Sequence, residues 1–206
     1  MTEVEPVPGL RERKRSSAIA RIQAAALDLF DERGYAAVTV EQIAEASEVS
    51  PSSVYRYFGS KEQIVLWSDF DVDLAAALRG DPVDESPLDV TRSVLRSVMD
   101  DLVGEDELRI QRRMRHVMSD ATLEAALARQ VYAASEALGE ILAARLGRPS
   151  DDLDVQVPAH AIVGALLGGL HHWHGIDCRE PLRDVLERCI DILEAGLQVG
   201  SPPQVG

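Results

Sequence analysis

The chain has 206 residues and a formal net charge of −14, and 46% of its residues are hydrophobic while 4% are aromatic. Such a length holds one large domain or two small ones, and a composition this poor in aromatic residues favours a helical protein over a β-sandwich. Two unclustered cysteines argue against a disulfide framework and a zinc module, and the longest apolar stretch, 162–170, is too short and too rich in glycine to span a bilayer.

The acidic charge is unevenly distributed along the chain. Residues 1–60 carry 7 basic and 9 acidic side chains, whereas residues 61–206 carry 14 and 26. Four basic residues near the N-terminus stand close together, namely Arg11, Arg13, Lys14 and Arg15. A local basic patch can hold phosphate groups while an acidic remainder keeps the protein soluble, so the net charge does not exclude binding to nucleic acid.

The first predicted helix runs from about residue 15 to residue 33 and follows a flexible basic arm, residues 1–14. The acidic, proline-bearing start of this arm does not have the pattern of a signal peptide, so we expect a cytoplasmic protein without membrane association. The apolar residues of the helix recur with its 3.6-residue period, as Ile22, Ala25, Ala26, Leu29 and Phe30. Gly34 stands just past the last turn, where a glycine commonly ends a helix.

Two short helices, 39–47 and 50–58, are predicted next and are joined across Glu48. Thr39 and Gln42 have the spacing of a capping box, which marks the start of the first helix. Ser50 followed by Pro51 marks the start of the second, because serine caps and proline fits the first helical position. The pair therefore forms a helix-turn-helix.

The second of these helices has one apolar and one polar side. Val54 and Phe58 point inward, and the outer faces carry small residues at the N-terminal end, followed by aromatic residues and an arginine. These outer residues are Pro51, Ser52, Ser53, Tyr55, Arg56 and Tyr57. Such a helix can enter a major groove with its N-terminus first, where hydroxyl groups and an arginine meet base edges or phosphates.

The segment from residue 15 to residue 66 closely resembles the DNA-binding domain of the TetR family of regulators. The resemblance is carried by the run RGYAAVTVEQIA (33–44), by VSPSSVYRYF (49–58) and by SKE (60–62). One departure lies in the turn, where the family usually has a glycine and this chain has Glu48. A left-handed backbone is often required there, so we expect modest strain at this residue without a change of fold.

The resemblance implies a set of DNA contacts on this domain. Phosphates would be held by Thr39, Ser53, Tyr55, Tyr57 and Lys61, and base edges would be faced by Pro51, Ser52 and Arg56, with Ser50 capping the helix that carries them. The basic arm could add further contacts. Alternatively, Tyr55 and Tyr57 only pack the domain and Arg56 is a solvated surface charge.

The rest of the chain is predicted to be helical, which gives an all-α protein of about nine helices. Helical segments lie near 61–79, 88–102, 106–118, 122–146, 154–174 and 182–198, between breaks that are rich in glycine and proline. We therefore divide the chain into the arm (1–14), a helix-turn-helix domain (15–60), a ligand-binding and dimerisation domain (61–198) and a disordered tail (199–206).

The last two predicted helices favour a homodimer. One apolar stripe follows the final helix through Leu182, Leu186, Cys189, Leu193 and Leu197, and small residues in the preceding helix allow close packing. A two-helix unit with so broad an apolar face should pair with its copy as a four-helix interface. The alternative is that these helices form only the internal core of one protomer.

An effector site is predicted around the arginine-rich segment 109–116, which contains four arginines in seven residues. This region loosely resembles the acyl-CoA-like ligand-binding domain of mycofactocin-type TetR regulators, so the arginines would clamp phosphates at the mouth of an apolar pocket. Alternatively, they pair with the acidic surface. The candidate ligand residues are Trp67, Phe70, Arg109, Arg112, Arg113, Met114, His116, Met118, Tyr132 and Trp173.

A second kind of sensor is suggested by His171, His174 and Cys178, which could make the protein a metal- or redox-responsive regulator. These residues are more simply interpreted as polar groups at a helix C-terminus, because no carboxylate stands at ligand spacing inside that helix. We therefore predict no metal site and no cofactor. Since no nucleophile elbow, phosphate loop or catalytic carboxylate pair is present, the sequence predicts a DNA-binding repressor with a small-molecule effector and not an enzyme.

Overall fold

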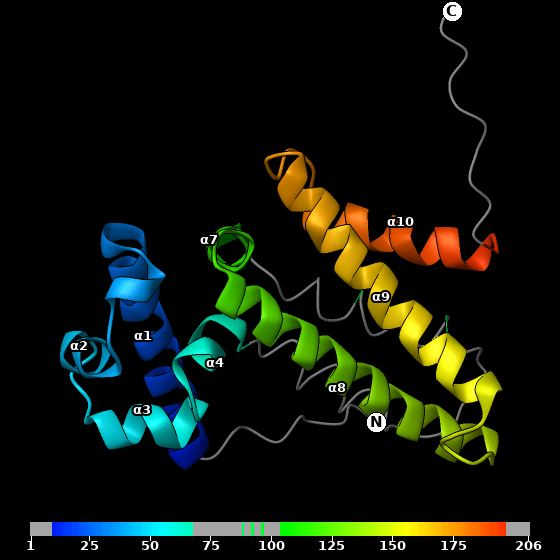
Figure 1. Cartoon of the computed structure of the whole chain (residues 1–206), viewed down its shortest axis with the longest axis horizontal. Coiled ribbons are helices and arrows are strands. Elements are labelled where there is room, and N and C mark those ends of the chain that lie inside the picture. The colour runs from blue at the N-terminus through cyan, green and yellow to red at the C-terminus, as the bar shows by residue number, and fades with distance from the viewer. Residues whose placement is uncertain (1–9, 68–87, 89–91, 93–95, 97–103, 197–206) are drawn as a thin grey trace, which may run out of the picture. The chain divides into compact units, whose positions relative to one another are not determined.

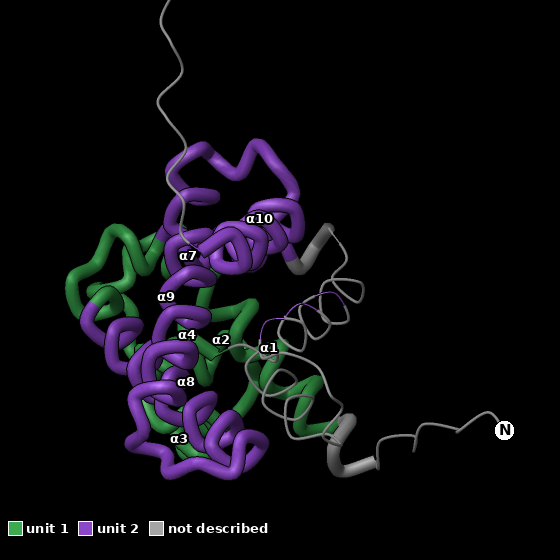
Figure 2. The backbone as a smooth tube through the Cα atoms, turned by 90° about the vertical axis from the view of Figure 1, so that its right-hand side faces the viewer, with its two compact units in different colours: residues 1–67, 116–124 green, residues 68–115, 125–206 purple. Residues whose placement is uncertain are grey.

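The computed structural model describes residues 10–67, 88, 92, 96 and 104–196, which form eight α-helices and one 3-10 helix without a strand (Figure 1). The chain divides into two compact units (Figure 2). Unit 1 comprises residues 1–67 and 116–124, and unit 2 comprises residues 68–115 and 125–206. The all-α class that the sequence predicts is confirmed.

Unit 1 contains α1 (Leu10–Arg33), the 3-10 helix η1 (Tyr35–Ala37), α2 (Val40–Ala46), α3 (Pro51–Phe58) and α4 (Lys61–Leu66). Helix α1 begins five residues earlier than predicted, because the residues from 10 to 14 (LRERK) are all good helix formers or tolerated in a first turn. The predicted arm is therefore helical from residue 10 onward, and residues 1–9 lie outside the described part of the chain.

The core of unit 1 is built on one face of α1, with α2 and α4 packed against it. This face buries Ile19, Ile22, Ala26, Leu27 and Phe30. Helix α4 buries its last three residues as well, so it belongs to unit 1, and the boundary that we predicted after residue 60 lies after Trp67.

A buried amide joins α1 to the C-terminal end of α4. The side chain of Gln23, which is 5% exposed, donates hydrogen bonds to the carbonyl oxygens of Ile64 at 3.0 Å and Trp67 at 2.8 Å. The last carbonyl groups of a helix have no partner within the helix, so this side chain satisfies groups that would otherwise be buried unpaired.

Unit 2 contains most of α7 (Gly104–Ser119) and α8 (Ala121–Leu146), together with α9 (Leu153–Gly175) and α10 (Leu182–Glu194). Their bounds lie within about two residues of the predicted segments, except that α10 ends four residues early. Gly196 stands just beyond it with φ 76°, a backbone conformation that stops a helix. The segments predicted for 68–79 and 199–206 lie outside the described residues, as does 88–102 apart from residues 88, 92 and 96.

Helices α8 and α9 meet at the end where residues 147–152 join them, and α10 runs alongside α9 (Figure 1). Near the joined end, buried residues of α8 and α9 form one core cluster. A second cluster lies between α9 and α10, around Trp173, Leu182, Val185, Leu186 and Ile190. The predicted apolar stripe of α10 is thus used, at least in part, inside the protomer.

Candidate DNA-binding site

Helix α3 begins as its sequence predicts. The backbone of Ser50 is extended, its hydroxyl oxygen accepts a hydrogen bond from the N–H of Ser53 at 3.2 Å, and Pro51 occupies the first turn. Val54 and Phe58 are buried, which fixes the rotation of the helix. On the other side of the helix, Pro51, Ser52, Tyr55 and Arg56 are exposed, and Ser53 and Tyr57 are half-buried.

Hydroxyl groups gather at the N-terminal end of α3. The Ser50 hydroxyl lies 2.9 Å from the hydroxyls of both Ser52 and Ser53. The cluster is exposed, and its small side chains let a partner approach the end of the helix closely. At this end, free N–H groups and the helix dipole favour a negatively charged group.

The single cation of α3, Arg56, is held by its neighbours. Its guanidinium donates to the hydroxyls of Ser53 at 3.4 Å and Tyr57 at 3.3 Å, and it lies 4.9 Å from the centre of the Tyr57 ring. The side chain is nevertheless exposed, and Tyr55 beside it is 49% exposed. Packing of the domain therefore does not explain the presence of a tyrosine at position 55. Tyr57 is half-buried, and its hydroxyl and ring contact the guanidinium of Arg56.

The start of α2 is the predicted capping box. The N–H of Gln42 donates to the Thr39 hydroxyl oxygen at 3.3 Å, and the N–H of Thr39 donates to the Gln42 side-chain oxygen at 2.9 Å. Because the Thr39 oxygen is used as an acceptor, its O–H remains available to donate outward. Thr39 is exposed, so this group can reach a phosphate.

Lys61, the remaining predicted DNA contact, is half-buried at the first residue of α4. Its ammonium donates hydrogen bonds to two main-chain carbonyl oxygens of the same unit, those of Tyr35 and Val38. No motif in the sequence indicates this arrangement. Tyr35 itself, which the sequence analysis did not single out, is 7% exposed and lies 5.2 Å from the ring of Phe30.

His116 lies in unit 1, apart from the candidate arginines of α7, which belong to unit 2. It is 8% exposed, its Nε2 lies 2.8 Å from a carboxylate oxygen of Asp31 on α1, and its ring meets the edge of Phe30 at 5.7 Å. Met118, which is exposed, and Trp67, which meets Phe58 edge-on at 5.8 Å, also belong to unit 1. These three residues are built into, or attached to, the DNA-binding unit.

The other candidate ligand residues in the described part of the chain belong to unit 2. The arginines at 109, 112 and 113 are half-buried and each has interactions within the protein, and Met114 is buried. Tyr132 is 61% exposed and meets the ring of His160 at 6.0 Å. Trp173 is buried in the cluster between α9 and α10, where its Nε1 donates to the carbonyl of Glu180 at 2.7 Å. Phe70 lies outside the described residues.

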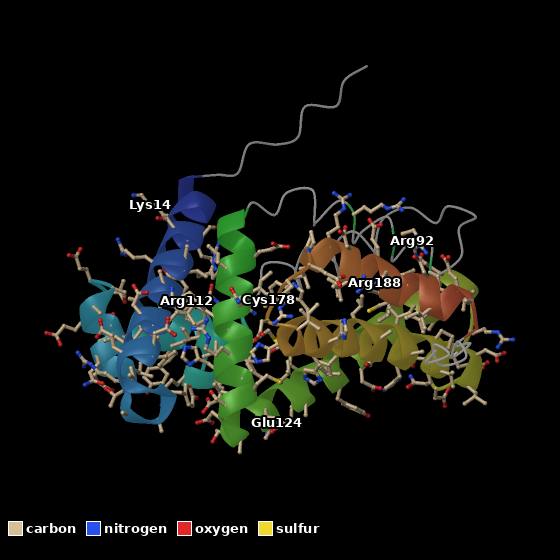
Figure 3. All side chains as sticks on the ribbon, turned by 90° about the horizontal axis from the view of Figure 1, so that it is seen from above. Lys14, Arg92, Arg112, Glu124, Cys178 and Arg188 are labelled. Carbon is tan, nitrogen blue, oxygen red and sulfur yellow. The ribbon has the colours of Figure 1, made fainter. Side chains whose placement is uncertain are left out.

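The metal- or redox-sensing alternative has no support. Among the described residues, no group of three or more histidines, cysteines and acidic residues is placed to hold a metal ion. Cys178 lies in the turn beside α7 (Figure 3), and burial, followed by the charge of Asp177, raises the pKa of its thiol. A raised pKa disfavours the reactive thiolate.

Two family profiles match the chain. Residues 22–66 match that of the bacterial regulatory proteins of the tetR family, and residues 85–198 match that of the MftR C-terminal domain. The chain belongs to the TetR family. It is thus a DNA-binding transcriptional regulator, with a helix-turn-helix domain and a ligand-binding domain, from a family of soluble proteins that are not enzymes.

Two relatives cover most of the chain. The HTH-type transcriptional regulator TcmR of Streptomyces glaucescens is 38% identical over 152 residues, which span 70% of this chain and 67% of TcmR. MftR of Mycobacterium tuberculosis, named for the regulation of mycofactocin biosynthesis, is 30% identical over 190 residues, which span 90% of this chain and 93% of MftR.

Solved structures show the same fold. The complex of SmeT with triclosan is similar with a TM-score of 0.58 and 22% identity, covering 87% of this chain and 91% of SmeT. The repressor FadR of Thermus thermophilus, in complex with lauroyl-CoA, has a TM-score of 0.50 and 23% identity, covering 91% and 99%. At these identities the likeness extends to the fold alone.

Proposed function

We propose that this TetR-family regulator is a homodimeric repressor that binds operator DNA through α3 and leaves it when a small-molecule effector binds. The observation that carries the DNA-binding part is the polarity of α3. Its inner side is locked by buried Val54 and Phe58, so its hydroxyls and Arg56 are presented outward on a rigid helix. A repressor of this kind acts where the DNA is, in the cytoplasm.

The contacts divide into two classes by their position on the helix-turn-helix. Thr39, Ser53, Tyr55 and Tyr57 donate hydrogen bonds from their hydroxyl groups to phosphates, and Lys61 adds a cation, which fixes the register of the protein on the duplex. Pro51, Ser52 and Arg56 face base edges, with Ser50 holding the N-terminal end of the helix. Arginine paired to guanine is the commonest specific contact in a major groove.

Pairing of two copies through α9 and α10 places one α3 helix in each of two successive major grooves, about 34 Å apart. Helix α9 is long and apolar enough to cross a membrane by length and composition, and only 22% of its most apolar window is buried inside the protomer. One such helix is weak evidence for a membrane span, and an open apolar helix in a dimeric family is better used between subunits. Val157 and Ile192 are among the exposed apolar residues of these two helices.

The proposed effector is an apolar anion similar to acyl-CoA. The arginines of α7 supply cations for phosphate groups, and Met114, which is buried on the same helix, supplies apolar surface. FadR, which shares the fold, was solved with lauroyl-CoA. Titration of a long-chain acyl-CoA into the DNA complex should release the DNA. If saturating acyl-CoA leaves the complex intact, the effector belongs to another class.

Binding of the purified protein to fragments of its own genome tests the main proposal. The affinity for a specific fragment should fall steeply as salt is raised, because bound phosphates release counterions. Arg56→Ala should weaken binding by about 1–3 kcal/mol and relax the preference for one base pair. The absence of salt-sensitive binding to any fragment would exclude the proposed function. An unchanged preference in Arg56→Ala would only remove Arg56 from the base-reading set.

A further inference from the structure

Helix α10 begins without a capping side chain of its own. Its N-cap residue is Pro181, and the N–H groups of Asp184 and Val185 bond to the carbonyl oxygen of this proline. The N–H of Leu182, the first residue of the helix, donates instead to a carboxylate oxygen of Glu107 on α7 at 2.8 Å. A carboxylate at this end of a helix also meets the positive end of the helix dipole. A residue 75 positions earlier in the chain therefore caps the start of α10.

The same face of α7 makes two further contacts with the corner formed by the end of α9 and the start of α10. Ile110 packs against the cluster of buried residues around Trp173 and Leu182. The side chain of Gln111 interacts with the thiol of Cys178, which lies in the turn between the two helices (Figure 3). These two positions and that of the capping glutamate share one face of α7, since helical neighbours three and four residues apart lie together. All of these residues belong to unit 2.

The arginines proposed to hold the effector lie on the other side of α7. They stand at positions 109, 112 and 113, each two residues after one of the three docking positions. Because an α-helix turns by about 100° per residue, a step of two residues leads to the opposite side. Helix α7 therefore has an effector side and a docking side, and a displacement of the helix caused on the first side reaches the start of α10 through the second.

We propose that Glu107 is a positioning residue that fixes the start of α10 to the effector helix α7, so that the strength of the dimer depends on the position of α7. The inference rests on the proposed function, in which α9 and α10 pair two copies of the chain. With the carboxylate in place, the first turn of α10 is already ordered in the free protomer. Without it, this turn must be ordered at the moment of pairing, which weakens the dimer.

Two substitutions of Glu107 test its role in the dimer. Glu107→Ala removes the acceptor of the Leu182 N–H, and the dissociation constant of the dimer should rise about tenfold, because a hydrogen bond to a charged group is lost. Glu107→Gln keeps an acceptor oxygen at the same reach, so it should restore at least about half of this loss on a logarithmic scale. Sedimentation equilibrium measures the constants, and exchange of labelled subunits compares the dissociation rates where the dimer is too tight for dilution. A value for Glu107→Ala within about twofold of the wild type would overturn the proposal.

Glu136→Ala provides the matched control. Glu136 is an exposed glutamate of α8 in the same unit, so its loss should leave the dissociation constant within about twofold of the wild type. Amide hydrogen exchange of the dimeric variants then separates a local effect from a general loss of stability. In Glu107→Ala, residues 182–186 should exchange at least about fivefold faster, while residues 138–143, in the cluster between α8 and α9, exchange as in the wild type. Equal acceleration in both segments would indicate a merely structural role and contradict the proposal.

Palmitoyl-CoA, used as the probe, tests whether α7 transmits the effect of a ligand. The ratio of operator affinities without and with saturating palmitoyl-CoA measures the coupling, and it should be at least about fivefold smaller in Glu107→Ala than in the wild type. The reason is that the arginines still bind the probe but no longer displace α10. An equal ratio in the two proteins would overturn the proposal. If palmitoyl-CoA does not release the wild type, the proposed effector class is refuted, and the dimer measurement decides the inference alone. A monomeric wild type would refute the proposed function instead.

Discussion

Glu48 is the residue of the helix-turn-helix that departs from the family pattern, and its backbone is left-handed, with φ 53°. A residue with a Cβ pays about 1–2 kcal/mol for this conformation, whereas glycine does not. The strain that we expected from the sequence is therefore confirmed. The surrounding hydrogen bonds, from the N–H of Glu48 to the carbonyl of Glu45 and from that of Val49 to Ala44, hold the turn in this form.

Glu48→Gly should raise the free energy of unfolding by about 0.5–1 kcal/mol, since relief of the strain exceeds the greater entropy of glycine in the unfolded chain. Urea denaturation followed by circular dichroism measures the change. The matched control is Glu45→Gly, three residues earlier and also exposed, which should lower stability by about 1 kcal/mol because it lies within α2. Equal losses in both variants would show that the turn is not strained.

Tyr35 should make the protein sensitive to alkali. Burial, followed by the charge of Glu62, raises the pKa of its hydroxyl. In the unfolded chain a tyrosine ionises near pH 10. Below that pH the neutral hydroxyl is present in both states. Above it only the unfolded state loses the proton, so stability falls as pH rises.

Tyr35→Phe should remove this part of the pH dependence. Between pH 10 and pH 11 the wild type should lose about 1 kcal/mol more stability than the variant, because one unit of pH corresponds to about 1.4 kcal/mol for one proton. Denaturation curves of both proteins at pH 8, 10 and 11 provide the comparison, and the wild type is its own control at pH 8. Parallel losses in the two proteins would mean that Tyr35 ionises in the folded state.

At the scale of the helices, local signals in the sequence were sufficient to predict where a helix begins when a capping residue marks that position. The capping residues of α2 and α3 are correct to the residue, because Thr39 and Ser50 satisfy N–H groups within their own helix. The start of α1 was missed, since no capping residue marks it. Gln23 could have been noticed, because it is polar yet shares the inward face of Ile19, Ile22 and Phe30.

Contacts between distant segments could not be predicted from the sequence. His116 hydrogen bonds Asp31, 85 residues away, and the Lys61 ammonium meets a carbonyl 26 residues away. Hydrophobic periodicity gives the inward face of a helix but not the element that it meets. For the same reason, the sequence did not indicate that the described residues predicted for the effector site are divided between the two units.

The packing of α9 against α10 depends on a glycine. A Cβ at Gly169 would lie 2.6 Å from the sulfur of Cys189 and 3.1 Å from a methyl carbon of Leu186. Gly169→Ala should therefore lower the free energy of unfolding by about 1–3 kcal/mol, as overpacked cores do. Cys189→Ala removes the nearest atom, so it should recover part of this loss when combined with Gly169→Ala. Full additivity of the two losses would show that the helices separate freely.

At the scale of the whole molecule, the negative charge is unevenly distributed between the helix-turn-helix part and the rest of the chain. The acidic excess lies mainly in residues 61–206, outside the helix-turn-helix, while residues 1–60 are nearly neutral. An acidic remainder discourages unspecific attachment to DNA, so affinity must come from the placement of a few contacts. A dimer doubles these contacts and makes their spacing part of the recognition, which a single unit cannot achieve.

The exposed side of α9 provides the test of this dimer. Gly164 and Gly168 are exposed, and a Cβ at either would meet no atom within 4 Å, in contrast to Gly169 beside them. A long charged side chain at Gly168 should thus leave the protomer folded but prevent two copies of α9 from approaching. We expect Gly168→Arg to be monomeric at micromolar concentration and to bind the operator at least 100-fold more weakly, since one half-site contributes alone.

Sedimentation equilibrium and operator titration measure the two effects on the same samples. The matched control is Ala133→Arg, on the exposed side of α8 opposite to buried Ser135 and Leu138, which should leave both the dimer and its affinity unchanged. Circular dichroism establishes that both variants are folded. If Gly168→Arg remained a dimer, the four-helix interface would have to lie elsewhere than on this face of α9. If it became a monomer with undiminished affinity, the operator would be read by one copy of α3, and the spacing of two grooves would play no part in recognition.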